Sequence, residues 1–263
     1  RSSAASDVYK RQIIVKRKQD SGAYGEKNER RNKMKHLRKQ IAGYLLTLIL
    51  LMAGIVFPGS GEKVLASGGS MTVHFLDVGQ GLSILVQSEG QNLLYDGGPR
   101  SASSYVVSYL QEQNVSEIDY LISSHYDEDH VSGLIGCLNA FQVDNVIGAD
   151  YIHDSSLYGS FMDAVAAHGL EVQHPAVGAE YTFGSGEFTI LSPKEISKES
   201  NANSVAIKLT NGENSFVFTG DADFNCEADM VNSGLDLSCD VLSVGHHGSA
   251  TVSYTHLTLP TIA

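Results

Sequence analysis

The chain is organised around Ile118–Gly133, which has the sequence IDYLISSHYDEDHVSG. These residues predict a short apolar strand that stops at two serines, a tight loop with two histidines and three carboxylates, and the start of a helix. Three consecutive negative charges, at Asp127, Glu128 and Asp129, repel one another unless a cation compensates them. Because Asp oxygens and neutral His nitrogens are both ordinary ligands of divalent metals, the stretch predicts a metal site at the end of a strand.

A second interpretation gives Asp127 or Asp129 the task of capping the following helix, where a carboxylate also favours the positive end of the helix dipole. Capping explains one acid, and it leaves His125 and His130 without a role. We therefore favour the metal site.

The two ends of the chain differ from its middle. The first and last dozen residues resemble translated sequencing adapters, and residues 13–33 are polar and basic without a hydrophobic period. We interpret residues 1–33 as a non-native leader and residues 252–263 as an adapter-derived tail. The natural start is then Met34.

Residues 34–66 have the three parts of an export signal in order. A basic head precedes the apolar core Ile41–Phe57, and Val64-Leu65-Ala66 offers small residues at the usual cleavage spacing. The core is at the short edge of a membrane span, so an uncleaved N-terminal anchor is the second interpretation. Either one predicts that the domain at residues 67–251 is secreted or held on the extracellular face of a bacterial membrane.

The charge of the chain changes at the same point. The sequence has 18 Lys and Arg and 30 Asp and Glu; fourteen and five of them precede Ser67, which leaves four and twenty-five for the rest. The remaining domain therefore has a formal charge of −21 (4 minus 25). Proteins that bind duplex DNA use Lys and Arg to displace counterions, so we expect duplex DNA to be a disfavoured partner.

Strand and helix patterns alternate after Ser67, which predicts an α/β domain whose sheets are covered by helices. The predicted strands are residues 71–77, 82–87, 92–96, 118–122, 143–147, 188–191, 204–210, 215–219 and 240–244. The predicted helices are residues 103–113, 131–140, 156–168 and 227–232.

Polar groups follow several of these strands directly. Asp96 closes one strand, where it suits a turn and a supporting role at the site equally well. Asp221 follows another in Thr219-Gly220-Asp221, and the pair His246-His247 follows the last. Adjacent histidines after an apolar strand are costly to bury without partners, so this pair indicates a site. We interpret three other histidines as ordinary surface or core side chains: His153, His168 and His174.

The chain resembles the metallo-β-lactamase superfamily in motifs that occur in the same order: Leu94-Tyr95-Asp96-Gly97-Gly98, His125-x-Asp127-x-Asp129-His130, Gly220-Asp221 and His246-His247-Gly248-Ser249. With Phe75-Leu76-Asp77-Val78-Gly79-Gln80-Gly81 in front, it is similar in particular to the C-terminal domain of ComEC-type competence proteins. The resemblance implies an αββα sandwich of two mixed sheets flanked by helices. It also implies that the fold is incomplete at its C-terminus here, which predicts an unpaired edge in the second sheet.

The resemblance further implies two divalent ions, zinc or manganese, as cofactors. Their ligands would be His125, Asp127, Asp129, His130, Asp221 and either His246 or His247. Among them, Asp129, His130 and Asp221 would be catalytic, with Asp221 bridging both ions. These ions would activate a water for attack and stabilise the developing oxyanion.

Four residues differ from an ordinary ligand in what the resemblance implies for them. Asp96 would orient the metal loop from outside the ligand set. Asp127 stands where most of the superfamily has histidine. Near the position of the superfamily's third histidine the chain has Asn201 and Asn203, and an amide oxygen is a weaker ligand than an imidazole.

Three functions are compatible with these residues. The resemblance implies an exported hydrolase of a small-molecule or single-stranded nucleic-acid phosphodiester, with a role as a nuclease in DNA uptake. The acidic charge favours instead a small or cell-wall-derived ester or lactone as substrate. A catalytically weak binding module of the same fold is the third interpretation.

Overall fold

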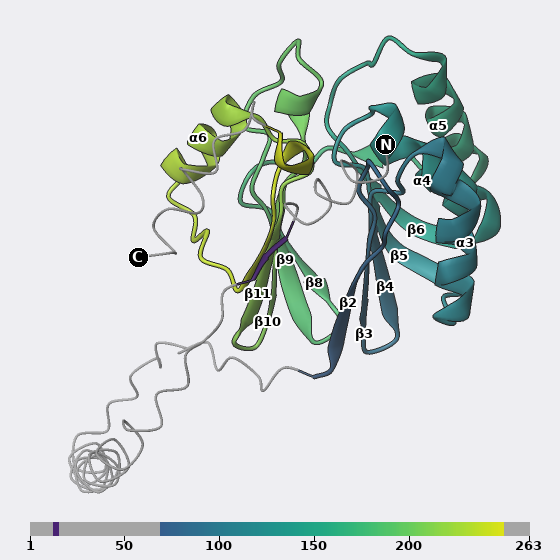
Figure 1. The fold of residues 1–263 in the computed structure, drawn as a ribbon, viewed down its shortest axis with the longest axis horizontal. Coiled ribbons are helices and arrows are strands. Elements are labelled where there is room, and N and C mark those ends of the chain that lie inside the picture. Colours follow the sequence, from purple (N-terminus) through teal and green to yellow (C-terminus); the bar gives the residue numbers. More distant parts are fainter. Residues whose placement is uncertain (1–12, 16–68, 250–263) are drawn as a thin grey trace, which may run out of the picture. The chain divides into compact units, whose positions relative to one another are not determined.

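Two six-stranded sheets face each other in the computed structural model of this chain, and helices cover their outer faces (Figure 1). The structure describes residues 13–15 and 69–249. The predicted export signal and the adapter-derived tail lie outside the described residues, as does most of the predicted leader. No helix in the described part of the chain is long and apolar enough to cross a membrane.

The first sheet has the strand order β2-β3-β4-β5-β6-β7. It opens as an antiparallel meander and continues as parallel strands from β4 onward, each new strand arriving after a helix or a long connection. Its strands are β2 (Met71–Phe75), β3 (Ile84–Ser88), β4 (Gln91–Tyr95), β5 (Glu117–Ile122), β6 (Gln142–Ile147) and β7 (Val172–Gln173). Its helices are α3 (Ser103–Glu112), α4 (Glu128–Ala140) and α5 (Ser156–Ala167), with the short turn η1 (Arg100–Ala102) before α3.

The second sheet has the strand order β1-β12-β11-β10-β9-β8. It is antiparallel except for the pair β11 and β12, which run parallel because α6 connects them. Its strands are β1 (Ile13–Val15), β8 (Glu180–Phe183), β9 (Gly186–Ile190), β10 (Ile207–Asn211), β11 (Asn214–Phe218) and β12 (Val241–Ser243). The remaining helices are α6 (Phe224–Asn232), η2 (Asn201–Asn203) and η3 (His246–Gly248).

The core has three layers because side chains alternate between the two faces of each strand. Leu85 and Leu94 face one way and join the cluster packed under α3, α4 and α5. Their neighbours Ile84 and Leu93 face the other way and join the cluster between the two sheets. A third cluster lies between the second sheet and α6. These layers confirm the predicted αββα sandwich of two mixed sheets.

Most predicted elements are present, with shifted ends. Helix α4 begins at Glu128, three residues before the predicted start, because its first turn is acidic rather than apolar and a helix N-terminus favours negative charge. The strands β7 and β8 were not predicted. Strand β10 begins at Ile207 rather than at Ser204, because the Val205 backbone N–H donates to Ser124 O instead of to a strand neighbour.

The edge of the second sheet differs from the expectation of an unpaired strand. Ile13–Val15 pair antiparallel with β12 in the register Ile13 to Ser243 and Val15 to Val241. These three residues lie inside the segment that we interpreted as leader, and their β-branched sequence suits an edge strand. The outer edge of β12 is therefore occupied in the structure.

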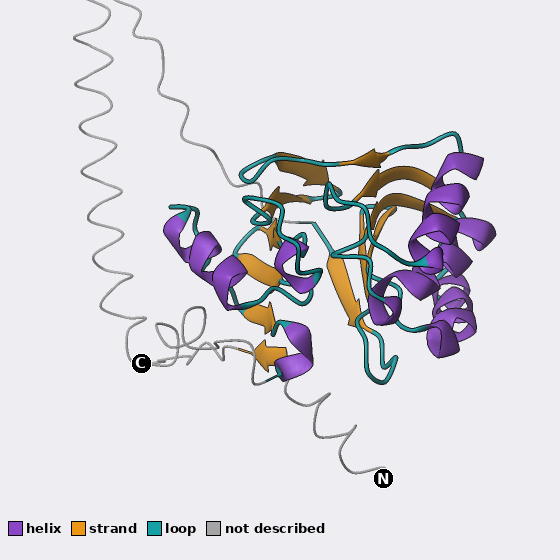
Figure 2. Cartoon of the chain, turned by 90° about the horizontal axis from the view of Figure 1, so that it is seen from above, coloured by secondary structure: helices purple, strands orange, loops and turns teal. Residues whose placement is uncertain are grey.

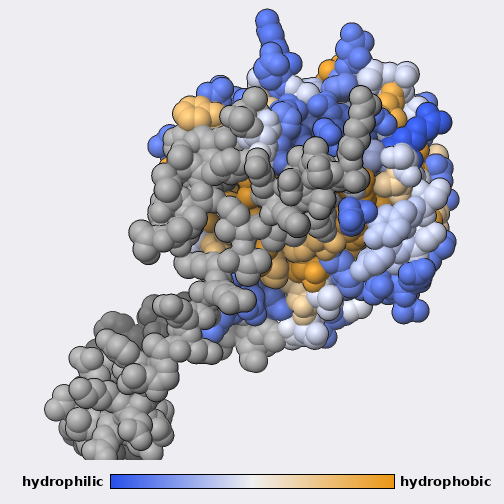
Figure 3. Space-filling view, in the orientation of Figure 1, coloured by the Kyte–Doolittle hydropathy of each residue, from blue (hydrophilic) through white to orange (hydrophobic). Residues whose placement is uncertain are grey.

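The loops at one end of the sandwich hold the candidate site residues. Seen from above, the longer helices lie on the two outer sides, and strands, loops and short helices lie between them (Figure 2). On the face shown in Figure 3, hydrophilic residues lie around the margin, and hydrophobic residues gather toward the middle. The core clusters are apolar, so the polar side chains that are buried need a separate explanation.

Candidate metal centre

Strand β5 delivers the central loop into a buried position. The loop residues Ser124 and His125 are fully buried, and α4 starts immediately after Asp127. Asp127 occupies the N-cap position of α4, but its side chain makes no capping hydrogen bond. The helix therefore does not use this carboxylate, which points to other partners.

Asp96 is a fully buried carboxylate at the end of β4, with φ at +58°. It accepts hydrogen bonds from the backbone N–H and the hydroxyl of Ser124, both at 2.7 Å, and from His130 Nδ1 at 2.8 Å. Three donors compensate the desolvation of this buried charge. Because a carboxylate can only accept, Nδ1 of His130 carries a hydrogen, and Nε2 is turned toward the middle of the cluster.

The same hydroxyl fixes His125. Since the Ser124 hydroxyl gives its only hydrogen to Asp96, it accepts from His125 Nδ1, which lies 3.0 Å away. The other nitrogen of His125, Nε2, is therefore a bare lone pair in the neutral ring. This atom is buried and makes no hydrogen bond in the described part of the chain.

Asp221 follows β11 and lies opposite these imidazoles. Its Oδ1 is 3.1 Å from His130 Nε2 but not in hydrogen-bond geometry, and its Oδ2 is 3.5 Å from His247 Nε2. Gly220 precedes it with φ at +55°, and a Cβ there would lie 2.5 Å from the Ser124 Cβ. Only glycine allows this close approach of the two loops.

The histidine pair after β12 is divided between two environments. Both residues have positive φ, 48° and 51°, which is rare outside glycine and marks a constrained turn. His247 is buried, and its Nε2 lies 3.1 Å from Asp129 Oδ2 and 3.3 Å from His130 Nε2. His246 is one third exposed, and its Nε2 is 3.9 Å from Asp221 Oδ2.

Among the described residues, two groups of potential ligand atoms result, each with all atoms within 4.8 Å of one another. One group is His125, His130 and Asp221, and the other is Asp129, His130 and His247. A bare imidazole nitrogen that faces carboxylate oxygens without a hydrogen bond is unfavourable unless a cation lies between them. These residues therefore fit a divalent metal, for which neutral imidazole and carboxylate are suitable ligands.

The electrostatics of the cluster agree with a cation-binding site. Burial alone would lower the pKa of His130, but the charges of Asp221 and Asp96 outweigh burial and raise this pKa well above its ordinary value. Burial raises the pKa of Asp221, yet His130, His125 and His247 outweigh it and hold the pKa well below its usual range. The Asp129 carboxyl behaves in the same way, and its pKa is lowered. The cluster thus attracts a positive charge to Nε2 of His130, whether a proton or a metal.

The profile of a family described as the Metallo-beta-lactamase superfamily matches residues 76–258. This chain belongs to that superfamily. It is 31% identical over 191 residues to Recombination protein 2 of Haemophilus influenzae, which covers 70% of this chain and 22% of that protein. It is 32% identical over 210 residues to Competence protein ComA of Neisseria gonorrhoeae, which covers 78% and 27%. The chain therefore spans about a quarter of the length of these curated relatives.

Among solved structures, a metallo-β-lactamase of Cronobacter sakazakii with a HARLDQ motif has a TM-score of 0.42 and 14% identity, and the alignment covers 60% of this chain and 64% of that one. Superfamily membership and the competence-protein relatives bear out the family resemblance that the ordered motifs indicated.

The two asparagines near the superfamily's third histidine have different surroundings. The amide nitrogen of Asn201 lies 3.3 Å from His246 Nδ1, at the margin of the cluster. Asn203 is buried, and both of its side-chain polar atoms bind the backbone of Ser197, at 2.7 and 3.1 Å. Asn203 therefore holds its own loop, and its side chain is not directed to the metal-ligand groups.

Asp127 belongs to neither ligand group, and it contacts residues that the sequence did not indicate. Its Oδ2 lies 3.5 Å from His125 Nε2, while its Oδ1 contacts Ser200 Oγ at 2.7 Å and His153 Nε2 at 3.2 Å. We interpreted His153 as a surface or core side chain, and the structure places it against a candidate ligand instead. No spacing in the sequence links His153 or Ser200 to Asp127, because they come from separate loops.

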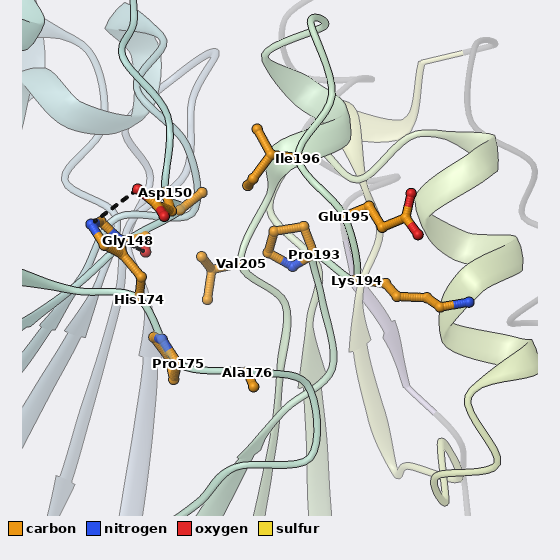
Figure 4. A pocket seen from close by; sticks show the side chains of 11 residues that line it. Gly148, Asp150, His174, Pro175, Ala176, Pro193, Lys194, Glu195, Ile196 and Val205 are labelled. Atoms are coloured by element: carbon orange, nitrogen blue, oxygen red, sulfur yellow. Dashed lines mark hydrogen bonds and ion pairs between the residues drawn. The ribbon is translucent and has the colours of Figure 1, made fainter.

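A cavity of about 200 Å³ lies between the loops that follow β6, β7 and β9 (Figure 4). Its wall includes Pro175, Ile196 and the pair His174 and Asp150, whose nearest charged atoms are 3.7 Å apart. None of the predicted site residues lines it. The two groups of histidine and aspartate side chains, rather than this cavity, therefore identify the candidate site.

Proposed function

We propose that this chain is a metal-dependent hydrolase of phosphodiester bonds that holds two divalent ions. The observation that carries the proposal is the buried Nε2 of His125, which has no hydrogen-bond partner in the described residues and faces the side chains of His130 and Asp221. The two ligand groups meet at His130, whose one free nitrogen would bind one ion, so two ions would lie close together, as in known two-metal phosphoesterases.

Divalent ions in these groups would supply Lewis-acid polarisation of a phosphoryl oxygen and a water that is acidic near neutral pH. The protein orients the ligands: Asp96 fixes the His130 ring, and the Ser124 hydroxyl fixes the His125 ring. Asp129 is the proton acceptor that we propose, because its side chain is 29% exposed and can exchange the proton with solvent.

The charge distribution supports a small or single-stranded substrate. Only Arg100, Lys194, Lys198 and Lys208 are basic after Ala66, and the Lys208 ammonium already pairs with Asp236 at 2.7 Å. A duplex needs a row of cations for phosphate contacts, and a single ester group at a metal pair does not. The name of the Neisseria gonorrhoeae relative refers to competence, so we propose single-stranded DNA during uptake, at the outer face of a bacterial membrane, as the physiological setting.

Metal analysis of the purified full chain tests the cofactor. We expect close to two zinc or manganese ions per chain, fewer in Asp221→Ala and His130→Ala, and no change in the control Asp236→Asn, because Asp236 lies outside both ligand groups. Metal-free protein that remains folded and active would contradict the proposal.

A substrate panel tests the reaction class. A chromogenic phosphodiester, a chromogenic ester, a lactone, and single-stranded and duplex oligonucleotides are compared at low salt, with His130→Ala as the blank. We expect turnover of the phosphodiester and of the single strand, and weak turnover of the duplex. Hydrolysis of the ester or lactone alone would assign the small-ester function, and metal binding with no turnover would assign a binding module. Robust duplex cleavage that is lost in His130→Ala would show that the acidic charge does not set specificity.

Expression from Met34 in a bacterium tests export. We expect the protein outside the cytoplasm with a new N-terminus near Ser67. A full-length membrane-bound form would favour the anchor, and a full-length soluble cytoplasmic form would exclude both interpretations.

A further inference from the structure

The two oxygens of Asp127 have different surroundings. Oδ2 faces the metal-ligand groups, 3.5 Å from His125 Nε2. Oδ1 faces away, toward Ser200 Oγ at 2.7 Å and His153 Nε2 at 3.2 Å. One oxygen is therefore occupied by two donors from outside the cluster, while the other remains directed to the site.

The donor at Ser200 is the end of a directional chain of hydrogen bonds. The Ser200 hydroxyl gives its single hydrogen to Asp127, so the Tyr151 hydroxyl, 2.8 Å away, donates to Ser200. Tyr151 in turn accepts from the backbone N–H of Tyr126 at 3.2 Å. This series of hydrogen bonds thus begins at the Tyr126 backbone and ends at the Asp127 side chain, so it fixes the carboxylate relative to its own backbone.

The donor at His153 is fixed by the start of a helix. Because a carboxylate only accepts, His153 Nε2 carries the hydrogen, and in the neutral ring Nδ1 is then an acceptor. Nδ1 lies 2.8 Å from the hydroxyl of Ser155, which is the N-cap of α5 and accepts from the Tyr158 N–H at 3.2 Å. The capping serine therefore uses its lone pair for the helix and its hydrogen for His153.

We infer that His153 and Ser200 are positioning residues that make Asp127 a one-oxygen metal ligand; this rests on the proposed function. An imidazole presents one nitrogen to a metal and is oriented through the other. A carboxylate can rotate or bind through both oxygens, and two donors on Oδ1 remove this freedom. Asp127, which stands where the superfamily usually has histidine, thereby presents a single oriented atom in place of an imidazole nitrogen.

Metal titration of the metal-free full chain tests this assignment. Manganese and zinc binding are measured by calorimetry, and the visible absorption of bound cobalt reports the ligand geometry. We expect Ser200→Ala and His153→Ala each to weaken the affinity for one of the two ions by about 10- to 100-fold and to change the absorption spectrum of bound cobalt. Ser200→Thr and His153→Gln keep a donor and should restore most of the affinity. The matched control is His174→Ala, because His174 also lies near an aspartate but outside the cluster.

The outcomes separate the two proposals. Unchanged affinity in both alanine variants overturns the inference and leaves the proposed function intact. An equal loss in Ser200→Thr and His153→Gln also overturns it, since the donors would then be irrelevant. An unmodified chain that binds no metal overturns the proposed function and this inference together. Thermal unfolding of each metal-free variant shows that a loss of affinity does not come from a loss of the fold.

Discussion

Glu227 in α6 should make the stability of this protein fall as the pH rises. Its side chain is only 2% exposed, and Oε2 has no hydrogen-bond partner in the described residues. Burial raises the pKa of this carboxyl from 4.5 to about 8, and the charge of Asp223 adds to the effect. The native state therefore keeps a proton on Glu227 over a pH range in which the unfolded chain has already released it.

The sign and size follow from linkage. Below about pH 4.5 both states are protonated, and Glu227 contributes no pH dependence. Between 4.5 and about 8 only the unfolded chain loses the proton, so the free energy of unfolding falls with pH. Each unit corresponds to about 1.4 kcal/mol, and local relaxation reduces the total, so the loss at pH 8 should be about 2–4 kcal/mol. Glu227→Gln stays neutral and avoids this loss.

Denaturant unfolding of the two proteins at pH 4.5 and pH 8 measures this difference. The variant and the unmodified chain should be equally stable at pH 4.5, and the variant should be more stable by about 2–4 kcal/mol at pH 8. Glu112→Gln on the exposed face of α3 is the control, with a change within about 0.5 kcal/mol at both pH values. A variant that is equally or less stable at pH 8 would show that Glu227 is ionised in the native state or makes a needed contact as an anion.

Three further outcomes are expected. Asp96→Asn leaves at least one of the donors on Ser124 and His130 without an acceptor. It should lower the unfolding free energy by about 2–4 kcal/mol, measured by denaturant unfolding, and weaken metal binding, measured by calorimetry. An unaffected variant would show that His130 needs no orienting acceptor. Gly220→Ala introduces a Cβ at positive φ, 2.5 Å from the Ser124 Cβ, and should lower the unfolding free energy by more than about 2 kcal/mol. An unchanged denaturation midpoint would show that the two loops can separate. Removing the metal with a chelator should lower the melting temperature. The loss is equivalent to about 2.7 kcal/mol of stability if the metal had been present at 100 times its Kd. A melting temperature that does not respond to the chelator would exclude metal bound by the native state.

The strands and helices could be predicted because their signals are local and repeated, whereas the sandwich of two sheets was implied by the family resemblance. The consecutive apolar residues in β3 and β4 predict strands with two buried faces, and the structure divides these side chains between two core layers. Strand β7 has only two residues, too few for any period to be visible. Strand β8 pairs with β9 across the turn at Gly184, and it also packs through a ring contact between Tyr181 and Tyr120, which are distant in sequence.

The candidate ligand set could be proposed from the sequence in part for the same reason. His125, Asp129 and His130 are close in sequence, so their crowding of charge is visible without a structure. Asp221 and His247 are distant, and only the ordered resemblance connected them to the loop before the sheets brought them within 3.5 Å of each other. The choice between His246 and His247 needed the backbone, because two consecutive positive φ angles send the two rings in different directions.

What the sequence did not reveal is the support around Asp127. A ligand is visible by its residue type, whereas a side chain that orients a ligand can be any donor within reach, here a serine and a histidine from two separate loops. The exchange of histidine for aspartate at position 127 is visible as a departure from the superfamily pattern, and such a change requires a compensating partner for the second oxygen. A departure at a ligand position therefore indicates where to search for new neighbours in the structure, and His153 and Ser200 are the neighbours that this search finds.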